Sequence, residues 1–179
     1  MRATRHLPLV GRLAANRAAQ ATWSSHAVGG RSIVRIVRRH EPPRFELRDA
    51  GQVRGHFVLL GAPQIVTEDG TWHLTRRRRH LSYFAVAHRP GAEGADAAFY
   101  PHWAGGGIIA FEQQRYQLQH PLFTESRLRD EERRIVALVT GDYTRGLTIQ
   151  LDRDARARPE IWLLLLFASW AILNEPAVG

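Results

Sequence analysis

The sequence contains no cysteine and no lysine. Without cysteine the chain has no disulfide, thiolate metal ligand, cysteine nucleophile or S-acylation site, which fits a reducing compartment. All 25 basic residues are arginine, which favours a GC-rich, bacterial genome. With 179 residues, 44% of them hydrophobic and 23% charged, the chain has the length of one domain and enough apolar residues for a core. Collagen-like, low-complexity and wholly disordered proteins are excluded.

Acidic residues are absent from residues 1–40, which contain eight arginines. The first acid is Glu41, and the rest of the chain holds 17 arginines and 17 acids, so the net charge of +8 belongs to the N-terminal part. We predict a flexible basic arm over residues 1–30 and a single domain over residues 31–179. The arm has the composition of an organellar transit peptide. Its alternatives are a solvated tail and a tether for an anionic partner such as membrane lipid, nucleic acid or an acidic protein.

Long apolar runs are also lacking. Residues 161–173, IWLLLLFASWAIL, are apolar for 13 residues. As a helix they span about 20 Å, whereas the hydrocarbon core of a bilayer is about 30 Å thick. Because this helix is apolar on every side, protein must enclose it. We predict a buried core helix with Pro159 in its first turn, and a short membrane anchor is the alternative.

Short β-strands are predicted for most of the chain between Ile33 and Leu151. Alternating or β-branched runs are separated by turn signals, such as those at 49–52 and 68–70. About nine or ten strands of this kind are typical of an antiparallel sandwich or barrel. A sheet encloses an apolar helix on all sides only by closing around it. We therefore predict an all-β fold with one core helix, a closed antiparallel barrel of about 10–12 strands wrapped around the hydrophobic C-terminal helix.

Two segments resemble the group formed by tubby C-terminal domains, LURP-one-related proteins and phospholipid scramblases. Residues 45–53, FELRDAGQV, resemble its opening strand, Asp–Gly turn and second strand, and residues 159–173 resemble its terminal core helix. The resemblance covers about residues 33–175 and implies a twelve-stranded barrel around that helix. It also implies phosphoinositide binding through basic surface residues, as in tubby-like members.

The calcium regulation of scramblases is not expected for this chain. At the matching place, Asp152 and Asp154 alternate with Arg153, Arg156 and Arg158. Two carboxylates do not supply the six to eight or so oxygens that Ca²⁺ takes, and the arginines repel the ion. The palmitoylated, cysteine-rich region of scramblases has no counterpart either.

Four consecutive arginines before His80 form the sharpest local feature. In a strand, two of them would point inward, so we predict a hairpin loop. Guanidinium groups bind phosphate oxygens bidentately, and the flanking Trp72, Tyr83 and Phe84 are suited to stack on bases or to seat among lipid headgroups. A solvated basic turn beside core aromatics is the alternative. The predicted anion- or lipid-binding residues are Arg35, Arg38, Arg39, Arg76, Arg77, Arg78 and Arg79.

Motifs for catalysis or metal binding are not recognisable in the sequence. The nine histidines form no HxH, HxxxH or HExxH pattern, and no serine lies in a GxSxG motif. Gly105–Gly107, followed by Ile108, is expected to be a turn entering a strand, and the pair Glu131 and Glu132 to be a charged turn. We predict no catalytic residue, no metal and no cofactor.

Together these patterns predict a non-enzymatic, cytoplasmic binding domain, with peripheral attachment to a membrane as an alternative location. Its predicted partner is an anionic phospholipid surface or another protein. One alternative is nucleic-acid binding through the basic arm and Arg76–Arg79. The other is a small-ligand carrier or enzyme, which requires a polar cavity beside the helix.

Overall fold

The computed structural model describes residues 30–58, 61–79, 82–102, 105–111, 114–120, 125–142 and 144–174. Except for Gly30, the predicted basic arm lies outside these residues, and its properties stay a prediction. The same holds for His80, which was expected in the hairpin loop.

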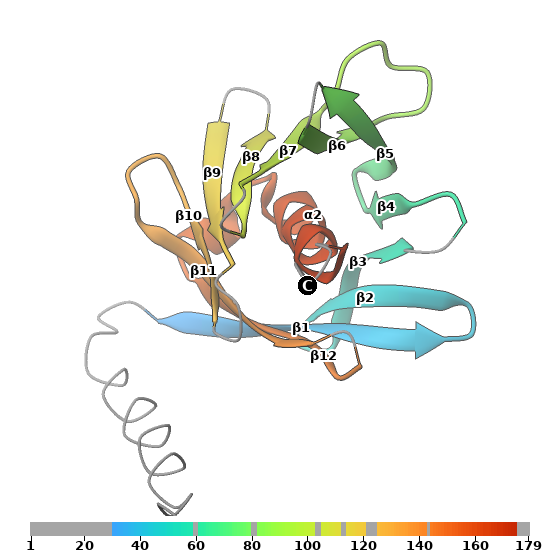
Figure 1. Cartoon of the computed structure of the whole chain (residues 1–179). Helices are drawn as coiled ribbons and strands as arrows, with labels where there is room; N and C mark the ends of the chain where they lie inside the picture. The colour runs from blue at the N-terminus through green and yellow to red at the C-terminus, as the bar shows by residue number, and fades with distance from the viewer. Residues whose placement is uncertain are drawn as a thin grey trace, which may run out of the picture. The chain divides into compact units, whose positions relative to one another are not determined.

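Within the described residues, twelve strands precede a short 3-10 helix and one α-helix (Figure 1). They are β1 (Arg31–His40), β2 (Pro43–Asp49), β3 (Gln52–Val58), β4 (Gln64–Thr67), β5 (Gly70–Arg79), β6 (Ser82–His88), β7 (Ala97–Pro101), β8 (Gly107–Phe111), β9 (Gln114–Gln119), β10 (Ser126–Arg129), β11 (Ile135–Asp142) and β12 (Gly146–Asp152). The helices are η2 (Ala155–Ala157) and α2 (Ile161–Asn174).

The sheet closes into an antiparallel barrel, as predicted. Each strand pairs with its neighbours along the chain, and β1 also pairs with β12. Val34 of β1, for example, lies opposite Ile149 on one side and Asp49 on the other. Along β1 the side chains alternate, with Val34 and Ile36 buried and Ile33 and Arg35 exposed, as expected for a wall with one apolar face. Closure pairs the described strands on both sides and so removes the edges through which sheets aggregate.

Helix α2 lies at the centre of the barrel (Figure 1). The consecutive residues Leu164, Leu165, Leu166 and Phe167 are all 0% exposed. Four consecutive residues cover every side of a helix, so α2 is enclosed all round, and the prediction of a buried core helix is confirmed. Among the described residues, no helix combines the length and the hydropathy needed to span a bilayer.

The barrel wall approaches α2 closely at Gly55 of β3. A Cβ atom at this position would lie 2.7 Å from Leu166 Cδ1 and 2.5 Å from the Val66 carbonyl oxygen. Glycine is therefore required here by the space between the strand and the helix.

The connections of the barrel alternate between its two ends, because neighbouring strands run in opposite directions. Those after β1, β3, β5, β7, β9 and β11 lie at one end, which we call the hairpin end. Those after the even-numbered strands lie at the other, the entry end. After β12 the chain passes through η2 at the entry end, and α2 then runs back towards the hairpin end.

Candidate functional site

The four consecutive arginines lie in a strand, so the predicted hairpin loop is wrong. Strand β5 continues through Arg79, and Arg76 and Arg77 pair with Ala85 and Phe84 of β6. The inward-pointing arginine that argued against a strand is accommodated because β5 reaches the rim of the hairpin end. There Arg76 is exposed and meets the end of α2.

Arg76 caps the C-terminus of the core helix. Its Nη2 donates hydrogen bonds to the carbonyl oxygen of Asn174 (3.1 Å) and to Asn174 Oδ1 (3.0 Å). A cation at a helix C-terminus is stabilised by the helix dipole, by about 0.3–1 kcal/mol. Arg76 thus positions α2, whereas Arg77, the next residue along the strand, is exposed on the opposite face of β5. The side chains of Arg78 and Arg79 lie outside the described residues.

Three arginines converge on one carboxylate on the outer face of β1 and β2. Glu46 lies between the core residues Phe45 and Leu47, and its side chain is only 4% exposed. Arg39 Nε donates to Glu46 Oε2 at 3.1 Å. Two further guanidiniums each donate through Nε and Nη2: Arg44 to Oε1 (3.0 and 2.7 Å) and Arg48 to Oε2 (3.1 and 2.7 Å).

The Glu46 cluster keeps a net positive charge. One carboxylate offsets one of three guanidiniums, and each of these side chains is about a third exposed or more. Burial alone would raise the pKa of Glu46, but the hydrogen bonds from Arg48, Arg44 and Arg39 outweigh it and lower that pKa to about 2. Because Glu46 holds the guanidiniums in place, less side-chain entropy remains to be lost when an anion binds them.

Glu46 is expected to make the stability of the domain sensitive to acid. Its pKa is lower in the folded chain, about 2, than the ordinary value of 4.5, so its contribution is complete above about pH 4.5 and is lost as the pH falls towards 2. Replacing Glu46→Gln should flatten this acid limb in urea unfolding curves recorded from pH 7 to pH 2. An unchanged acid limb in the variant would show that other carboxylates dominate it.

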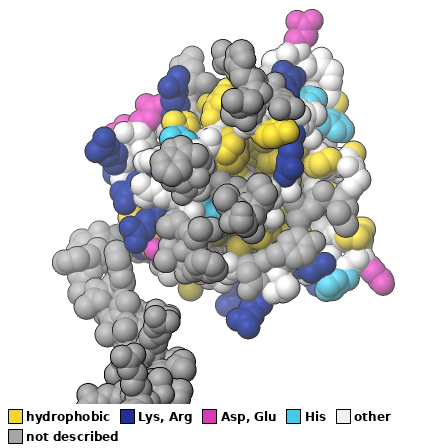
Figure 2. Space-filling view, viewed as in Figure 1, with side chains coloured by type: hydrophobic (Ala, Val, Ile, Leu, Met, Phe, Trp, Pro, Cys, Tyr) yellow, Lys and Arg dark blue, Asp and Glu magenta, His cyan; other side chains and the backbone are white. Residues whose placement is uncertain are grey.

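The barrel topology gathers part of the predicted binding set at the hairpin end. Arg38 and Arg39 lie near the end of β1, and Arg76 and Arg77 lie near the end of β5, so both pairs reach this end. Arg35 lies earlier in β1, further from this end, where it is exposed opposite Thr148. Figure 2 shows arginine side chains spaced around the rim of the molecule.

The prediction missed two arginines of the Glu46 cluster. Arg44 and Arg48 flank Glu46 at two residues on either side, which in a strand places all three side chains on one face. The spacing can be read from the sequence. The sequence does not show, however, that the Glu46 side chain lies on the outer face of the barrel.

Exposed aromatic side chains accompany the arginines at the hairpin end. Tyr83, at the start of β6, is 57% exposed, and Tyr100, at the end of β7, is 46% exposed. The rings of Phe84 and Tyr100 stack on the outer face, with centroids 5.6 Å apart. Of the three aromatics expected to flank the binding residues, Tyr83 and Phe84 are on this end, whereas Trp72 is buried in the core.

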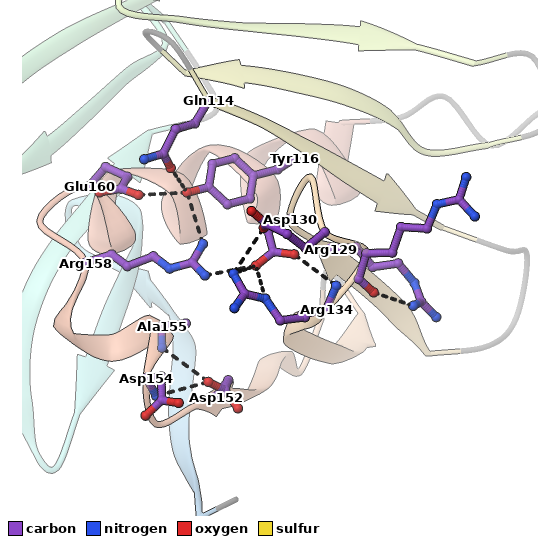
Figure 3. A network of polar contacts seen from close by, with 12 residues as sticks. Gln114, Tyr116, Arg129, Asp130, Arg134, Asp152, Asp154, Ala155, Arg158 and Glu160 are labelled. Carbon is purple, nitrogen blue, oxygen red and sulfur yellow. Dashed lines mark hydrogen bonds and ion pairs between the residues drawn. The ribbon is translucent and has the colours of Figure 1, made fainter.

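At the entry end, a polar network surrounds the segment that leads into α2 (Figure 3). Asp130 Oδ2 accepts hydrogen bonds from Arg158 Nη2 and Arg134 Nε, both at 3.0 Å. Burial would raise the pKa of Asp130, but these arginines outweigh it and lower that pKa. The Tyr116 hydroxyl donates to Glu160 Oε1 at 2.7 Å, and burial together with this hydrogen bond raises the pKa of Tyr116 to about 12.

A second buried carboxylate holds the same segment from another part of the wall. Asp49, at the end of β2, is 1% exposed and accepts a hydrogen bond from Arg156 Nη2 at 2.5 Å. Asp152 Oδ1 accepts the backbone N–H groups of Asp154 and Ala155, which shapes the turn before η2. Arg156 and Arg158 thus tie the entry segment to β2 and to the end of β10, which gives the entry-end network a structural role.

His120 and Ser126 form a further polar contact, which the sequence patterns did not predict. His120 Nδ1 lies 2.6 Å from Ser126 Oγ, and burial lowers the pKa of His120. A hollow of about 340 Å³ lies beside His120 and is also lined by His102, Gly105 and Gly107. Ser126 is 2% exposed, so its hydroxyl is not presented to a substrate.

Gly105 and Gly106 owe their presence to packing. Both have positive φ values, and a Cβ atom on Gly106 would clash with the Leu118 carbonyl oxygen. Strand β8 begins at Gly107, so the expected turn entering a strand is confirmed. Among the described residues, no group of three or more His, Asp or Glu side chains is placed to hold a metal ion.

Comparison with protein-family models, curated proteins and solved structures finds no match to this chain. The geometry of the hairpin end therefore supplies the argument for function.

Proposed function

We propose that the barrel is a non-enzymatic binding domain that docks its hairpin end on an anionic membrane surface. One observation carries this proposal: exposed arginines and exposed tyrosines occupy the same end. Arg39 and Arg77 supply positive charge there, and Tyr83 and Tyr100 supply amphipathic rings. Tyrosine is enriched at the headgroup level of membranes, where one end of the ring is apolar and the other is wet.

The energetics of such docking are electrostatic. Each arginine near an anionic surface contributes about 1 kcal/mol, and the attraction is screened by salt over a Debye length of about 8–10 Å. The Glu46 cluster contributes guanidinium groups that Glu46 already holds in position, and their forked N–H groups match the geometry of phosphate oxygens.

We also propose that the chain is a relative of the tubby, LURP-one and scramblase group. The closed barrel of twelve antiparallel strands with an enclosed C-terminal helix supports this proposal. So does the role of residues 45–53, in which Glu46 organises the arginine cluster and Asp49 holds the entry to the helix.

The test is co-sedimentation of the full chain with vesicles that contain phosphatidylserine and with neutral phosphatidylcholine vesicles, at low and high salt. The double variant Arg39→Gln/Arg77→Gln removes two charges from the hairpin end and leaves Glu46 paired with Arg44 and Arg48. We expect salt-sensitive binding to the anionic vesicles alone, weakened about 10- to 30-fold in the variant, from about 1 kcal/mol for each arginine.

The matched control removes two exposed arginines from the entry end, in Arg133→Gln/Arg153→Gln. Its binding should stay within about twofold of the unchanged chain, apart from a small long-range effect of net charge. Equal losses of vesicle binding in the two variants would show that binding depends on the net charge of the chain and not on the hairpin end. Binding to no vesicle, with salt-sensitive binding to single-stranded DNA, would replace the lipid proposal by nucleic-acid binding.

A further inference from the structure

Two histidines face each other on the outer surface of β5 and β6, away from the arginine cluster. His73 and His88 are directly opposite in the strand register. Their neighbours Leu74 and Ala87 are buried in the core, so both imidazoles belong to the outer face. The two ring centroids are 6.1 Å apart, and the ring planes are tilted by 32°.

Oxygen-bearing side chains extend this row on both sides. Gln64 of β4 lies opposite His73. On the other side, the backbone N–H of Asp96 donates to the Ala87 carbonyl oxygen at 2.9 Å, which places Asp96 across from His88. The register therefore aligns the amide of β4, the two imidazoles of β5 and β6, and the carboxylate of Asp96, which directly precedes β7.

One nitrogen of His88 is oriented as it is in histidines that bind metals. His88 Nδ1 lies 3.4 Å from the Arg89 carbonyl oxygen. A carbonyl only accepts, so this contact favours a proton on Nδ1 and leaves the lone pair on Nε2. Metal-binding histidines commonly donate their other ring N–H to a backbone carbonyl in this way.

The charges around the pair favour a cation. The Arg89 guanidinium lies over the ring of Trp72, 5.4 Å from its centroid, and Trp72 is on the inner face of β5, opposite to that of His73. The Arg89 backbone N–H donates to Asp96 Oδ2 at 3.1 Å, so a carboxylate remains beside His88.

We propose that His73 and His88 form a two-imidazole site for a borderline divalent cation such as Cu²⁺, Ni²⁺ or Zn²⁺. Imidazole suits these ions, whereas Mg²⁺ and Ca²⁺ prefer oxygen ligands. With metal–nitrogen bonds of about 2.0–2.1 Å, two imidazoles on one ion have centroids roughly 5–6.4 Å apart, a range that includes the 6.1 Å between His73 and His88. Water completes the coordination, and Asp96 acts as an outer partner that attracts the cation.

The test is calorimetric titration of the full chain with Cu²⁺, Zn²⁺ and Mg²⁺ as separate probes. The variants are His73→Gln, His88→Gln and the double variant, with His40→Gln as the control because His40 is an exposed histidine outside the pair. Each single variant should weaken the tightest Cu²⁺ or Zn²⁺ binding event at least tenfold. The double variant should lose little more, since either substitution already destroys the chelate.

Thermal unfolding provides a second readout, to which weak sites elsewhere contribute equally in every variant. A cation that binds the folded chain raises the unfolding midpoint, so Zn²⁺ should raise it in the unchanged chain and in His40→Gln but less in the pair variants. Equal losses in His40→Gln, independent additive losses at positions 73 and 88, or equally tight binding of Mg²⁺ would overturn the proposal.

Discussion

Replacing Gly55→Val is expected to lower the free energy of unfolding by about 3 kcal/mol or more. The Cβ atom alone would lie 2.5 Å from the Val66 carbonyl oxygen. This oxygen is part of the backbone of the neighbouring strand and cannot move aside by a change of rotamer. Leu166 Cδ1, at 2.7 Å, belongs to the fully buried part of α2. Overpacking of a filled core typically costs about 1–3 kcal/mol, and a clash with backbone adds to this cost. Urea unfolding followed by tryptophan fluorescence measures the change.

Gly94→Val is the matched control for this substitution. Gly94 lies in the connection between β6 and β7, and its Cβ atom would meet no atom within 4 Å. Its free energy of unfolding should stay within about 0.5 kcal/mol of that of the unchanged chain. If Gly55→Val were as stable as this control, α2 would not be held against β3 as described.

The fold was predictable because its two strongest constraints are local patterns. Residues 161–173 are apolar on every side, and such a helix needs protein all round it. The short alternating runs before it favour antiparallel strands, and closing these around the helix satisfies both patterns. The exact number of strands was harder to predict, because short strands such as β4 and β10 carry few alternations.

The candidate site was less predictable, because it depends on the strand register and on which residues the strands place at each end of the barrel. The four arginines at 76–79 were assigned to a loop on the assumption that an inward arginine is buried. The structure places Arg76 at the rim, where the carbonyl of Asn174 accepts its hydrogen bond across 98 residues of sequence. No local pattern encodes such a contact. Likewise, the pairing of Glu46 with Arg39 follows from the β1–β2 register, and that of Asp49 with Arg156 follows from barrel closure.

The second large effect is expected from Arg156→Met at the entry end. Of its ion-pair partners among the described residues, Asp49 would keep Arg54, whose Nε lies 3.6 Å from Oδ2, too far for a good hydrogen bond. Removing one partner of a buried ion pair costs about 3–5 kcal/mol, because the other charge stays buried without compensation. We expect a loss near the lower bound, since the Arg156 side chain is itself 38% exposed. Arg153→Met, an exposed arginine of the same segment, is the control and should be nearly neutral.

A double-mutant cycle distinguishes the ion pair from simple packing. Asp49→Asn removes the buried charge, and it should cost less than Arg156→Met because the partly exposed guanidinium of Arg156 retains water as a partner. In the double variant no charge is stranded, so the loss should be smaller than the sum of the two single losses by about 2 kcal/mol. Additive losses would mean that Arg156 stabilises the entry segment through its aliphatic stem. A coupling of the expected size would show that this carboxylate, at the end of β2, holds the segment that leads into the core helix across 107 residues of sequence.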